Sequence, residues 1–262
     1  PRTKTGPMPD CLTLLALDGV PMVRPNDDLA AIVDDAIAAI GETLDDGDII
    51  VVAQKIVSKA EGRIVDLRNI VPSDQAITLA KSVEKDPRHV EVILRESRAV
   101  VREKPGVLIV ENNLGLIMAN AGVDHSNVES DAPDETVLLL PADPDASAEQ
   151  LRQGLAARMG ASVGVIVNDS VGRPWRVGTT GLAIGVAGLP AVVDLRGDTD
   201  LYGRELRVSE QAVADELAAA ASYVMGQADE GSPVVLMRGA KLRPAEQGSA
   251  ALLRDRDKDM FR

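Results

Sequence analysis

Residues Ser162 to Ser170, SVGVIVNDS, join a buried strand to a polar end. The apolar run SVGVIV has the length and composition of a strand enclosed by protein, and it delivers Asp169 and Ser170 to its end. The preceding residues 141–160, PADPDASAEQLRQGLAARMG, predict a loop that runs into a helix. Because this order continues a strand–helix–strand pattern, we predict a mixed α/β (α+β) fold.

A second polar stretch, Asn120 to Ser130 (NAGVDHSNVES), forms a turn in which Gly122 frees the backbone. The turn carries oxygen ligands on Asp124, Ser126, Asn127 and Glu129. Such a set of ligands suits a hard cation. The stretch Asn168 to Arg176, NDSVGRPWR, has a similar composition. We therefore predict that Asp124 and Asp169, on separate loops at strand ends, hold one divalent metal between them.

Other strands and helices are predicted from apolar periodicity and from turn residues. The expected strands cover residues 11–17, 48–53, 99–103, 106–111, 115–119, 136–140 and 233–239. The strand at 48–53, DIIVVA, is apolar after its first residue, which predicts burial on both faces. The expected helices are one capped by Asn26, a short one near 54–63, two at 74–83 and 87–95, one capped by Asp145 or Ser147, and one at 209–225.

Composition limits the class of protein. The chain has 262 residues, 45 % of them apolar, which is ample core for one large domain or two intimate ones. Its longest mostly apolar stretch, Gly181 to Val193, contains three glycines and falls short of the roughly 20 residues that a membrane helix needs. A lone cysteine, Cys11, excludes an internal disulfide framework and favours a cytoplasmic location. A formal charge of −13 disfavours attraction to nucleic acid or anionic lipid, so we expect neither partner.

The two ends of the chain differ from the part between them. Residues 1–10, PRTKTGPMPD, are predicted to be a disordered leader. Residues 240–262 form a polar, charged tail that we expect to be partly ordered at most. The domain itself is therefore predicted to span residues 11–239.

Two features near the predicted site leave alternatives open. Lys55 and Lys59 stand four residues apart after the strand at 48–53, and they form either a positive pocket of phosphate size or part of a solvated surface. Trp175 is the only tryptophan, and it is either a packing residue or an aromatic face for a flat ligand ring. The chain contains neither a GxGxxG nor a GxxxxGK[ST] phosphate motif, so any nucleotide binds without these fingerprints.

Taken in order, several motifs resemble those of the coenzyme F420-0:γ-glutamyl ligase family. The resemblance runs from about Leu17 to Gly239 and rests on GVPMV, SKAEGR, NAGVDHSN, VIVNDSVGR, DLYGREL, MGQADEGS and VVLMRG. It implies that family's mixed α/β fold, with two intimate subdomains and a homodimer. It also implies a GTP-dependent amide ligase that uses Mg²⁺ or Mn²⁺, is helped by K⁺, and adds L-glutamate to coenzyme F420-0.

The resemblance also assigns roles to residues. The implied GTP contacts are Val20, Pro21, Met22, Val23, Gln54, Lys55, Lys59, Asn127, Met225, Gly226, Gln227, Ala228, Asp229, Glu230, Gly231 and Ser232. Asp124 and Asp169 resemble the catalytic ligands of one metal, and Ser170 and Gln227 those of a second. The family often has a glutamate where this chain has Gln227, and the neutral amide lowers the negative charge at that second position.

Contacts to the acidic substrate follow from motif context and chemistry. Arg173, Arg176 and Arg204 are candidates because guanidinium groups grip phosphodiesters and carboxylates in bidentate fashion, with structural ion pairs as the alternative. Trp175 is a candidate for stacking on the deazaflavin ring. For the general base, Asp169, Glu129 and Glu205 remain open. Two other functions also stay open: a related GTP-dependent ligase for another acid and amine, and a nucleotide-binding protein without turnover.

Overall fold

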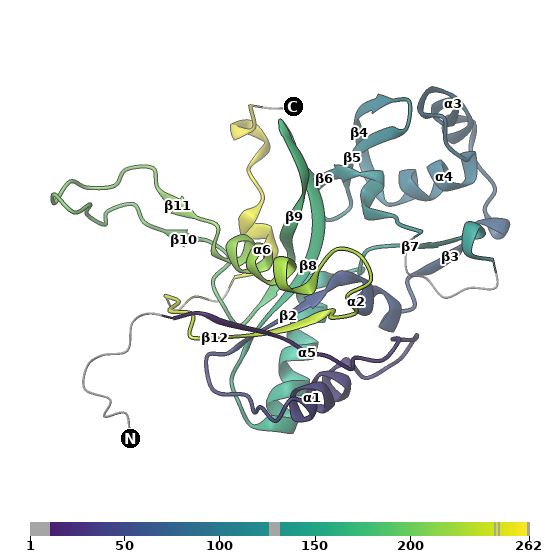
Figure 1. Ribbon diagram of the computed structural model, residues 1–262. Helices are drawn as coiled ribbons and strands as arrows, with labels where there is room; N and C mark the ends of the chain where they lie inside the picture. Colours follow the sequence, from purple (N-terminus) through teal and green to yellow (C-terminus); the bar gives the residue numbers. More distant parts are fainter. Residues whose placement is uncertain (1–10, 126–131, 244, 246, 261–262) are drawn as a thin grey trace, which may run out of the picture.

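A computed structural model describes residues 11–125, 132–243, 245 and 247–260, and the predicted leader lies outside them. At the centre is a five-stranded sheet of order β1-β12-β2-β8-β9 (Figure 1). Strands β2 and β8 run parallel, and the other neighbouring pairs are antiparallel. The strands are β1 (Thr13–Ala16), β2 (Ile49–Ala53), β8 (Gly164–Arg173), β9 (Arg176–Ala187) and β12 (Val234–Arg238).

Helices cover both faces of this sheet (Figure 1). They are α1 (Leu29–Ala39) and α5 (Pro144–Met159) on one face and α6 (Val213–Met225) on the other. Val52 of β2 belongs to the apolar cluster that includes Leu155 of α5, while Val51 belongs to the cluster that includes Ala218 of α6. β2 is therefore buried on both faces, which confirms the prediction from its continuous apolar sequence.

A third apolar cluster lies within residues 67–139, at the right of Figure 1. Strands β4, β5 and β6 form one antiparallel sheet there, β3 pairs with β7, and α3 and α4 complete the cluster. The strands are β3 (Ile64–Asp66), β4 (Ser97–Lys104), β5 (Val107–Asn112), β6 (Ile117–Ala119) and β7 (Thr136–Leu138), and the α-helices are α3 (Asp74–Val83) and α4 (Pro87–Arg95). Short 3₁₀ helices, labelled η, are η1 (Leu67–Asn69), η2 (Asn120–Gly122) and η3 (Pro133–Glu135). The mixed α/β class is thus confirmed, and α3 and α4 have the predicted bounds.

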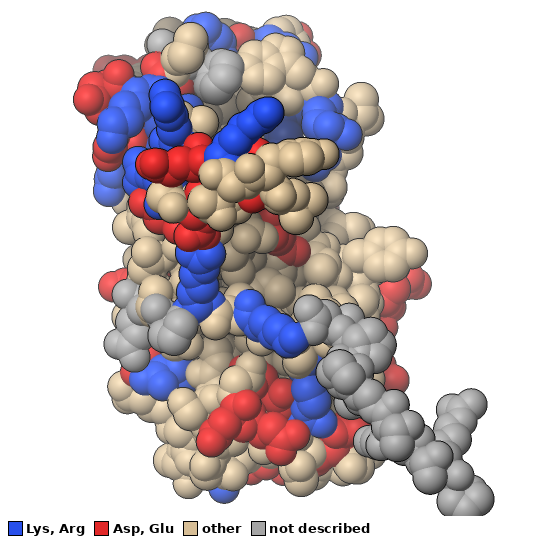
Figure 2. All heavy atoms as spheres, turned by 90° about the vertical axis from the view of Figure 1, so that its left-hand side faces the viewer, with Lys and Arg blue, Asp and Glu red and all other residues tan. Residues whose placement is uncertain are grey.

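A long excursion between β9 and α6 projects from the molecule at the left of Figure 1. We call residues 193–211 the arm; its base is the pairing of β10 (Val193–Asp194) with β11 (Glu210–Gln211). On the face seen in Figure 2, acidic and basic side chains are interspersed. On the arm itself, for example, Arg196 pairs with Asp194 at 2.7 Å.

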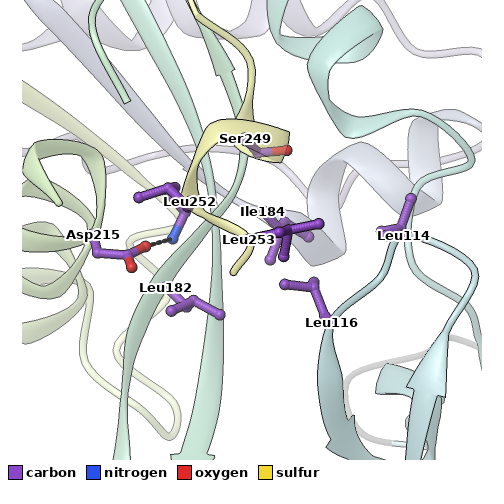
Figure 3. A pocket seen from close by; sticks show the side chains of 9 residues that line it. Leu114, Leu116, Leu182, Ile184, Asp215, Ser249, Leu252 and Leu253 are labelled. Atoms are coloured by element: carbon purple, nitrogen blue, oxygen red, sulfur yellow. Dashed lines mark hydrogen bonds between the residues drawn. The ribbon is translucent and has the colours of Figure 1, made fainter. Parts of the chain in front are cut away.

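The C-terminal segment lies against the edge strand β9. The Asp145 carboxylate accepts hydrogen bonds from the Val186 amide at 2.8 Å and from the Ser249 amide at 2.9 Å. The segment contains η4 (Ser249–Leu252) and η5 (Arg256–Lys258). Figure 3 shows a cavity of about 150 Å³ beside η4, with leucines at positions 114, 116, 182, 252 and 253 around it. None of the predicted site residues lines this cavity.

Three predicted helix starts are wrong, each for a local reason. α1 begins after Asp28, whose side chain accepts a hydrogen bond from the Ala31 amide at 3.1 Å. Asn26, the predicted cap, has a left-handed φ of 70°. α5 begins after Asp143, which caps it in place of Asp145 or Ser147. α6 begins at Val213 instead of residue 209, because residues 210 and 211 form β11.

β9 is a strand that the sequence did not predict. Its glycines are required by close contacts. A Cβ at Gly181 would lie 2.4 Å from the Ala218 carbonyl oxygen of α6, and one at Gly185 would lie 2.3 Å from the Pro144 carbonyl oxygen of α5. The glycine-rich composition therefore reflects helices on both sides of the strand. Among the described residues, no helix has the length and apolar composition to cross a membrane.

Candidate functional site

Strand register brings several predicted site segments to one edge of the central sheet. Ala16, near the end of β1, lies opposite Val235, and Val52, near the end of β2, lies opposite Val234. Ala53, the last residue of β2, lies opposite Asn168. The segments that follow β1 and β2, the segment before β12 and the second half of β8 therefore share this edge. Ligands of open α/β sheets commonly bind beyond strand ends of this kind.

An ion pair joins two of the predicted site residues. Lys55 lies in the first turn of α2 (Gln54–Ala60), which begins directly after β2. Its Nζ atom is 2.7 Å from Oδ2 of Asp124. Asp124 is held in place by backbone hydrogen bonds of 3.0 and 2.8 Å with Leu138. The pair therefore connects the central sheet to the part of the chain that contains the third apolar cluster.

Asp169 belongs to the same group of charges. Burial raises the pKa of its carboxyl group to about 6, and the nearby Asp124 carboxylate acts in the same direction. Three contacts oppose this shift: the Ser170 amide, which donates a hydrogen bond at 2.8 Å, the Lys55 charge, and a hydrogen bond from Gln54. Asp124, Lys55 and Asp169 therefore form one interacting cluster, which we call the charge cluster. The structure thus brings the two acidic stretches together.

Asp169 and Ser170 lie within a strand, which corrects the predicted loop. β8 continues to Arg173 and turns into β9 through Pro174 and Trp175. β9 was not predicted from the sequence. Its backbone pairs with this half of β8 and keeps it extended. Because successive side chains of a strand point to opposite faces, Asp169 and Ser170 face away from each other.

The donors of the charge cluster fit a divalent cation. Carboxylate oxygens are the ligands that Mg²⁺ and Mn²⁺ prefer, and the Lys55 ammonium group already places one positive charge against Asp124. Among the described residues, no group of three or more His, Cys, Asp or Glu side chains is arranged to hold a metal. A metal at the cluster would therefore draw its remaining ligands from water or from a bound phosphate, as Mg²⁺ commonly does.

Polar groups on α2 extend the cluster. Lys59 has only 8 % of its surface exposed, so the interpretation of a solvated surface lysine is wrong. Gln54 is also buried, and its Oε1 accepts a hydrogen bond of 2.9 Å from the Ser58 hydroxyl. Gln54, predicted as a GTP contact, is therefore also a hydrogen-bond partner of Asp169.

The predicted nucleotide loops meet at the same edge of the sheet. The Ser232 hydroxyl donates a hydrogen bond to Oδ1 of Asp18 at 3.3 Å, which connects the segment 225–232 to the segment 18–23. Pro21 and Met22 are exposed, Val20 is half-buried, and Val23 is buried in the core. Glu230 is exposed, and its carboxylate accepts a hydrogen bond from the Ala228 amide of the same loop at 2.8 Å. Met225, the last residue of α6, is buried in the apolar cluster between α6 and the sheet. Asn127 lies outside the described residues, as do Ser126 and Glu129.

Gln227 makes its side-chain hydrogen bonds to residues other than Asp169. Its amide nitrogen donates to the Ser222 hydroxyl at 2.9 Å, and its oxygen accepts from the Thr179 hydroxyl at 3.4 Å. Thr179 pairs with Gly172, which shares a strand face with Ser170. Ser170 and Gln227 therefore lie toward the α6 face of the hairpin, and Asp169 points to the opposite face.

The predicted substrate residues lie away from the charge cluster. Arg173, Trp175 and Arg176 form the tip of the β8–β9 hairpin. Arg173 is four residues beyond Asp169, which is roughly 13 Å at the usual rise of a strand, and Arg176 lies opposite Arg173. Trp175 is 81 % exposed with a left-handed φ of 59°, so the interpretation of a packing residue is wrong. Neither Arg173 nor Arg176 makes an ion pair within the described part of the chain.

Arg204 lies on the arm together with Glu205. Its guanidinium carbon is 5.9 Å from the centre of the Tyr202 ring, which is an intramolecular cation–π contact. Nothing among the described contacts joins the arm to the charge cluster of the same chain. Glu205 instead forms a backbone bridge with Thr199 inside the arm.

Sequence reasoning missed residues that lie outside the charge cluster but contact the residues and loops around it. His89 of α4 is buried, and its ring meets the His125 ring edge-on at a centroid distance of 4.7 Å. The Nδ1 atom of His125 lies 3.1 Å from the Thr136 carbonyl oxygen, where it donates a hydrogen bond. These contacts fix the residue next to Asp124. Asp18 and Thr179 were missed as well. Asp18 directly follows the first predicted strand, which is a signal that the sequence did contain.

These features place the chain in a class: a mixed α/β protein with lysines and carboxylates gathered at one sheet edge. Comparison with known sequences gives the family. The sequence profile of the F420-0:Gamma-glutamyl ligase family matches residues 19–239, and the chain belongs to that family.

Several relatives match along almost the whole chain. A protein of Methanothermobacter thermautotrophicus named coenzyme F420:L-glutamate ligase is 47 % identical over 254 residues, covering 96 % of this chain and 99 % of the relative. Proteins of the same name from Methanopyrus kandleri and Natronomonas pharaonis are 46 % and 44 % identical, covering 96 % and 95 % of this chain and 99 % and 94 % of the relatives.

Proposed function

We propose that this protein is a GTP-dependent ligase that joins L-glutamate through an amide bond to coenzyme F420-0, and that it can add further γ-linked glutamates. Family membership and the names of its relatives support the substrates. The observation that carries the reaction type is the charge cluster. Two carboxylates and a lysine meet at a sheet edge where the segments 18–23, 54–59 and 225–232 also converge.

The chemistry of amide formation explains why a triphosphate is needed. The carbon of a carboxylate is a poor electrophile, so the acid must first be activated. In the proposed first step, a carboxylate oxygen of the acceptor attacks the γ-phosphorus of GTP, and GDP leaves with the electrons of the broken P–O bond. The α-amine of glutamate then attacks the acyl carbon, phosphate leaves, and the amine gives up a proton. The products are the amide, GDP and phosphate.

The residues of the site suit phosphoryl transfer, which depends mostly on positioning and charge neutralisation. Lys55 and Lys59 lie four residues apart on α2, where they would neutralise phosphate oxygens. Asp124 and Asp169 would hold Mg²⁺ or Mn²⁺. When bound, such a metal neutralises the charge that develops between the β- and γ-phosphates. Asp169, with a pKa raised to about 6, remains one of the candidates for the base that accepts the amine proton. K⁺ belongs to the proposal through the family resemblance.

A homodimer with two intimate subdomains is part of the same proposal. The part of the chain around the third apolar cluster, residues 67–139, would be the second subdomain. On the arm, Leu201, Tyr202 and Val208 each expose 85 % or more of their surface. Apolar side chains that project so far into water are typical of a contact surface, and a second copy of the chain is the partner we propose. Arg173, Trp175, Arg176 and Arg204 remain the proposed contacts for the acidic, ring-bearing substrate.

One reaction mixture tests the proposed function. The purified protein is incubated with GTP, Mn²⁺, L-glutamate and coenzyme F420-0, and both GDP and the acceptor mass are measured. We expect GDP release together with a mass gain of glutamate. GDP release only with another acid and amine would support a related ligase, and tight GTP binding without GDP would support a nucleotide-binding protein. Either result would overturn the proposal.

Variants of the charge cluster test its assignment. Asp124→Asn and Asp169→Asn keep the size of each side chain and remove its charge, so each should abolish GDP formation while the protein stays folded. A suitable control is Asp74→Asn, an exposed carboxylate in the first turn of α3. Near-normal turnover in either cluster variant would show that the shared-metal assignment is wrong.

A further inference from the structure

The Lys55–Asp124 ion pair places a cation where the proposed function places a metal. Nζ of Lys55 is 2.7 Å from Oδ2 of Asp124, which is the close contact of a charge-assisted hydrogen bond. The side chains remain 27 % and 42 % exposed, so solvent ions can reach both partners. The ammonium group also acts on the neighbouring Asp169, whose pKa it lowers while Asp124 raises it. One lysine thus offsets part of the repulsion between two carboxylates.

A divalent cation and Lys55 therefore compete for Asp124. The ammonium group occupies Oδ2 of Asp124, and its positive charge repels a divalent cation that approaches either oxygen of this carboxylate. With Lys55 in place, the three groups have a formal net charge of −1 when both carboxylates are ionised, and without it the charge is −2. Two charges about 4 Å apart interact strongly enough, at the dielectric of a protein surface, to change an affinity by about tenfold or more.

Lys55 has a second destination if a nucleotide binds. It lies in the first turn of α2, directly after β2, at the edge where the nucleotide segments converge. A phosphate group there would attract the ammonium group away from Asp124 and leave the carboxylate open to the metal. The long side chain of lysine has enough rotatable bonds to exchange partners without movement of the backbone.

We propose that Lys55 is a placeholder for the metal: it holds Asp124 in the metal-free protein and moves to the phosphates when the nucleotide arrives. This inference rests on the proposed function, because it uses Asp124 and Asp169 as metal ligands. Its consequence is positive coupling. The nucleotide raises the affinity for the metal, and the metal raises the affinity for the nucleotide by the same factor. The protein would thus avoid binding the metal firmly before its nucleotide.

Direct Mn²⁺ binding tests the inference without the ligation reaction. Free Mn²⁺ is followed by electron paramagnetic resonance during titration of the wild type, Lys55→Gln and Lys55→Arg. Without nucleotide, Lys55→Gln should bind Mn²⁺ at least about tenfold more tightly, because the competing charge is gone. Lys55→Arg, which keeps the charge, should stay within a few-fold of the wild type. Lys81→Gln, on the exposed side of α3, is the control for a change in net charge alone.

The second half of the test adds GDP, with a correction for Mn²⁺ bound by free GDP. GDP should raise the Mn²⁺ affinity of the wild type and have a smaller effect on Lys55→Gln. Unchanged Mn²⁺ affinity in a folded Lys55→Gln protein overturns the inference, whether or not the protein ligates glutamate. Mn²⁺ binding that persists unchanged in Asp124→Asn also overturns it, and removes the metal assignment from the proposed function as well. The ligation assay judges the rest of that function separately.

Discussion

Replacing Asp169 by asparagine should stabilise the metal-free protein at neutral pH, although it removes a site residue. Burial raises the pKa of this carboxyl group from 3.8 to about 6, a shift of about two units. Between these values the folded state binds more protons than the unfolded state, so the stability that Asp169 contributes is present below pH 3.8 and is lost as the pH rises through 6. Each unit corresponds to about 1.4 kcal/mol, which gives about 3 kcal/mol above neutral pH. Because Asp169 is partly exposed, this figure is an upper bound.

The assay compares urea unfolding of the wild type and Asp169→Asn from pH 4 to pH 8, with a chelator present. Far-ultraviolet circular dichroism is the suitable signal, because Trp175 is 81 % exposed and its fluorescence reports little on the core. The difference between the two proteins carries the test. His89, whose pKa burial lowers to about 4, stabilises the fold as the pH rises and would mask the effect in a single curve.

The free energy of unfolding of Asp169→Asn should equal that of the wild type near pH 4 and exceed it increasingly toward pH 8. Asp194→Asn is a control of opposite sign. Arg196 lowers the pKa of Asp194 to about 2. Removal of the Asp194 carboxylate should therefore destabilise the protein at neutral pH and leave its stability unchanged at low pH. A difference for Asp169→Asn that does not change with pH, or that falls as the pH rises, would refute the raised pKa of Asp169 in the charge cluster.

Three further predictions concern other parts of the molecule. Lys59→Ala should weaken GTP binding more than glutamate binding in calorimetric titrations, and an unchanged GTP dissociation constant would remove Lys59 from the nucleotide site. Gly181→Ala should destabilise the protein by roughly 1–3 kcal/mol in urea unfolding, because the new Cβ would lie 2.4 Å from the Ala218 carbonyl oxygen. The control Gly172→Ala, whose Cβ would have no neighbour within 4 Å, should leave the stability nearly unchanged. Leu201→Ser on the arm should shift the protein toward monomers in sedimentation experiments, and an unchanged mass would argue against the arm as the dimer contact.

Local sequence signals predicted much of the fold. α3 and α4 have the expected bounds because each has a strong cap: the Ser73 hydroxyl accepts from the Ala76 amide, and the Asp86 carboxylate accepts from the Arg88 amide. β2 was predicted because an unbroken apolar run is typical of a strand covered on both faces. β9 was missed because the reason for its glycines lies in helices that are distant in the sequence.

The candidate site was predictable in its residues and less so in its geometry. Sequence motifs pointed to Asp124, Asp169 and Lys55, and the structure brings all three into one cluster. The ion pair between Lys55 and Asp124 was not foreseen, because it depends on how the segment carrying Asp124 lies against α2. The opposite orientation of Asp169 and Ser170 follows from their position inside β8, which only the pairing with β9 establishes.

Anomalous scattering from a crystal grown with GDP and Mn²⁺ would test the shared-metal site directly. We predict a manganese peak within ligand distance of carboxylate oxygens of both Asp124 and Asp169, with the GDP phosphates beside it and the Lys55 ammonium group turned toward them. A manganese peak elsewhere, with the Lys55–Asp124 ion pair intact and GDP bound at another part of the surface, would contradict the account.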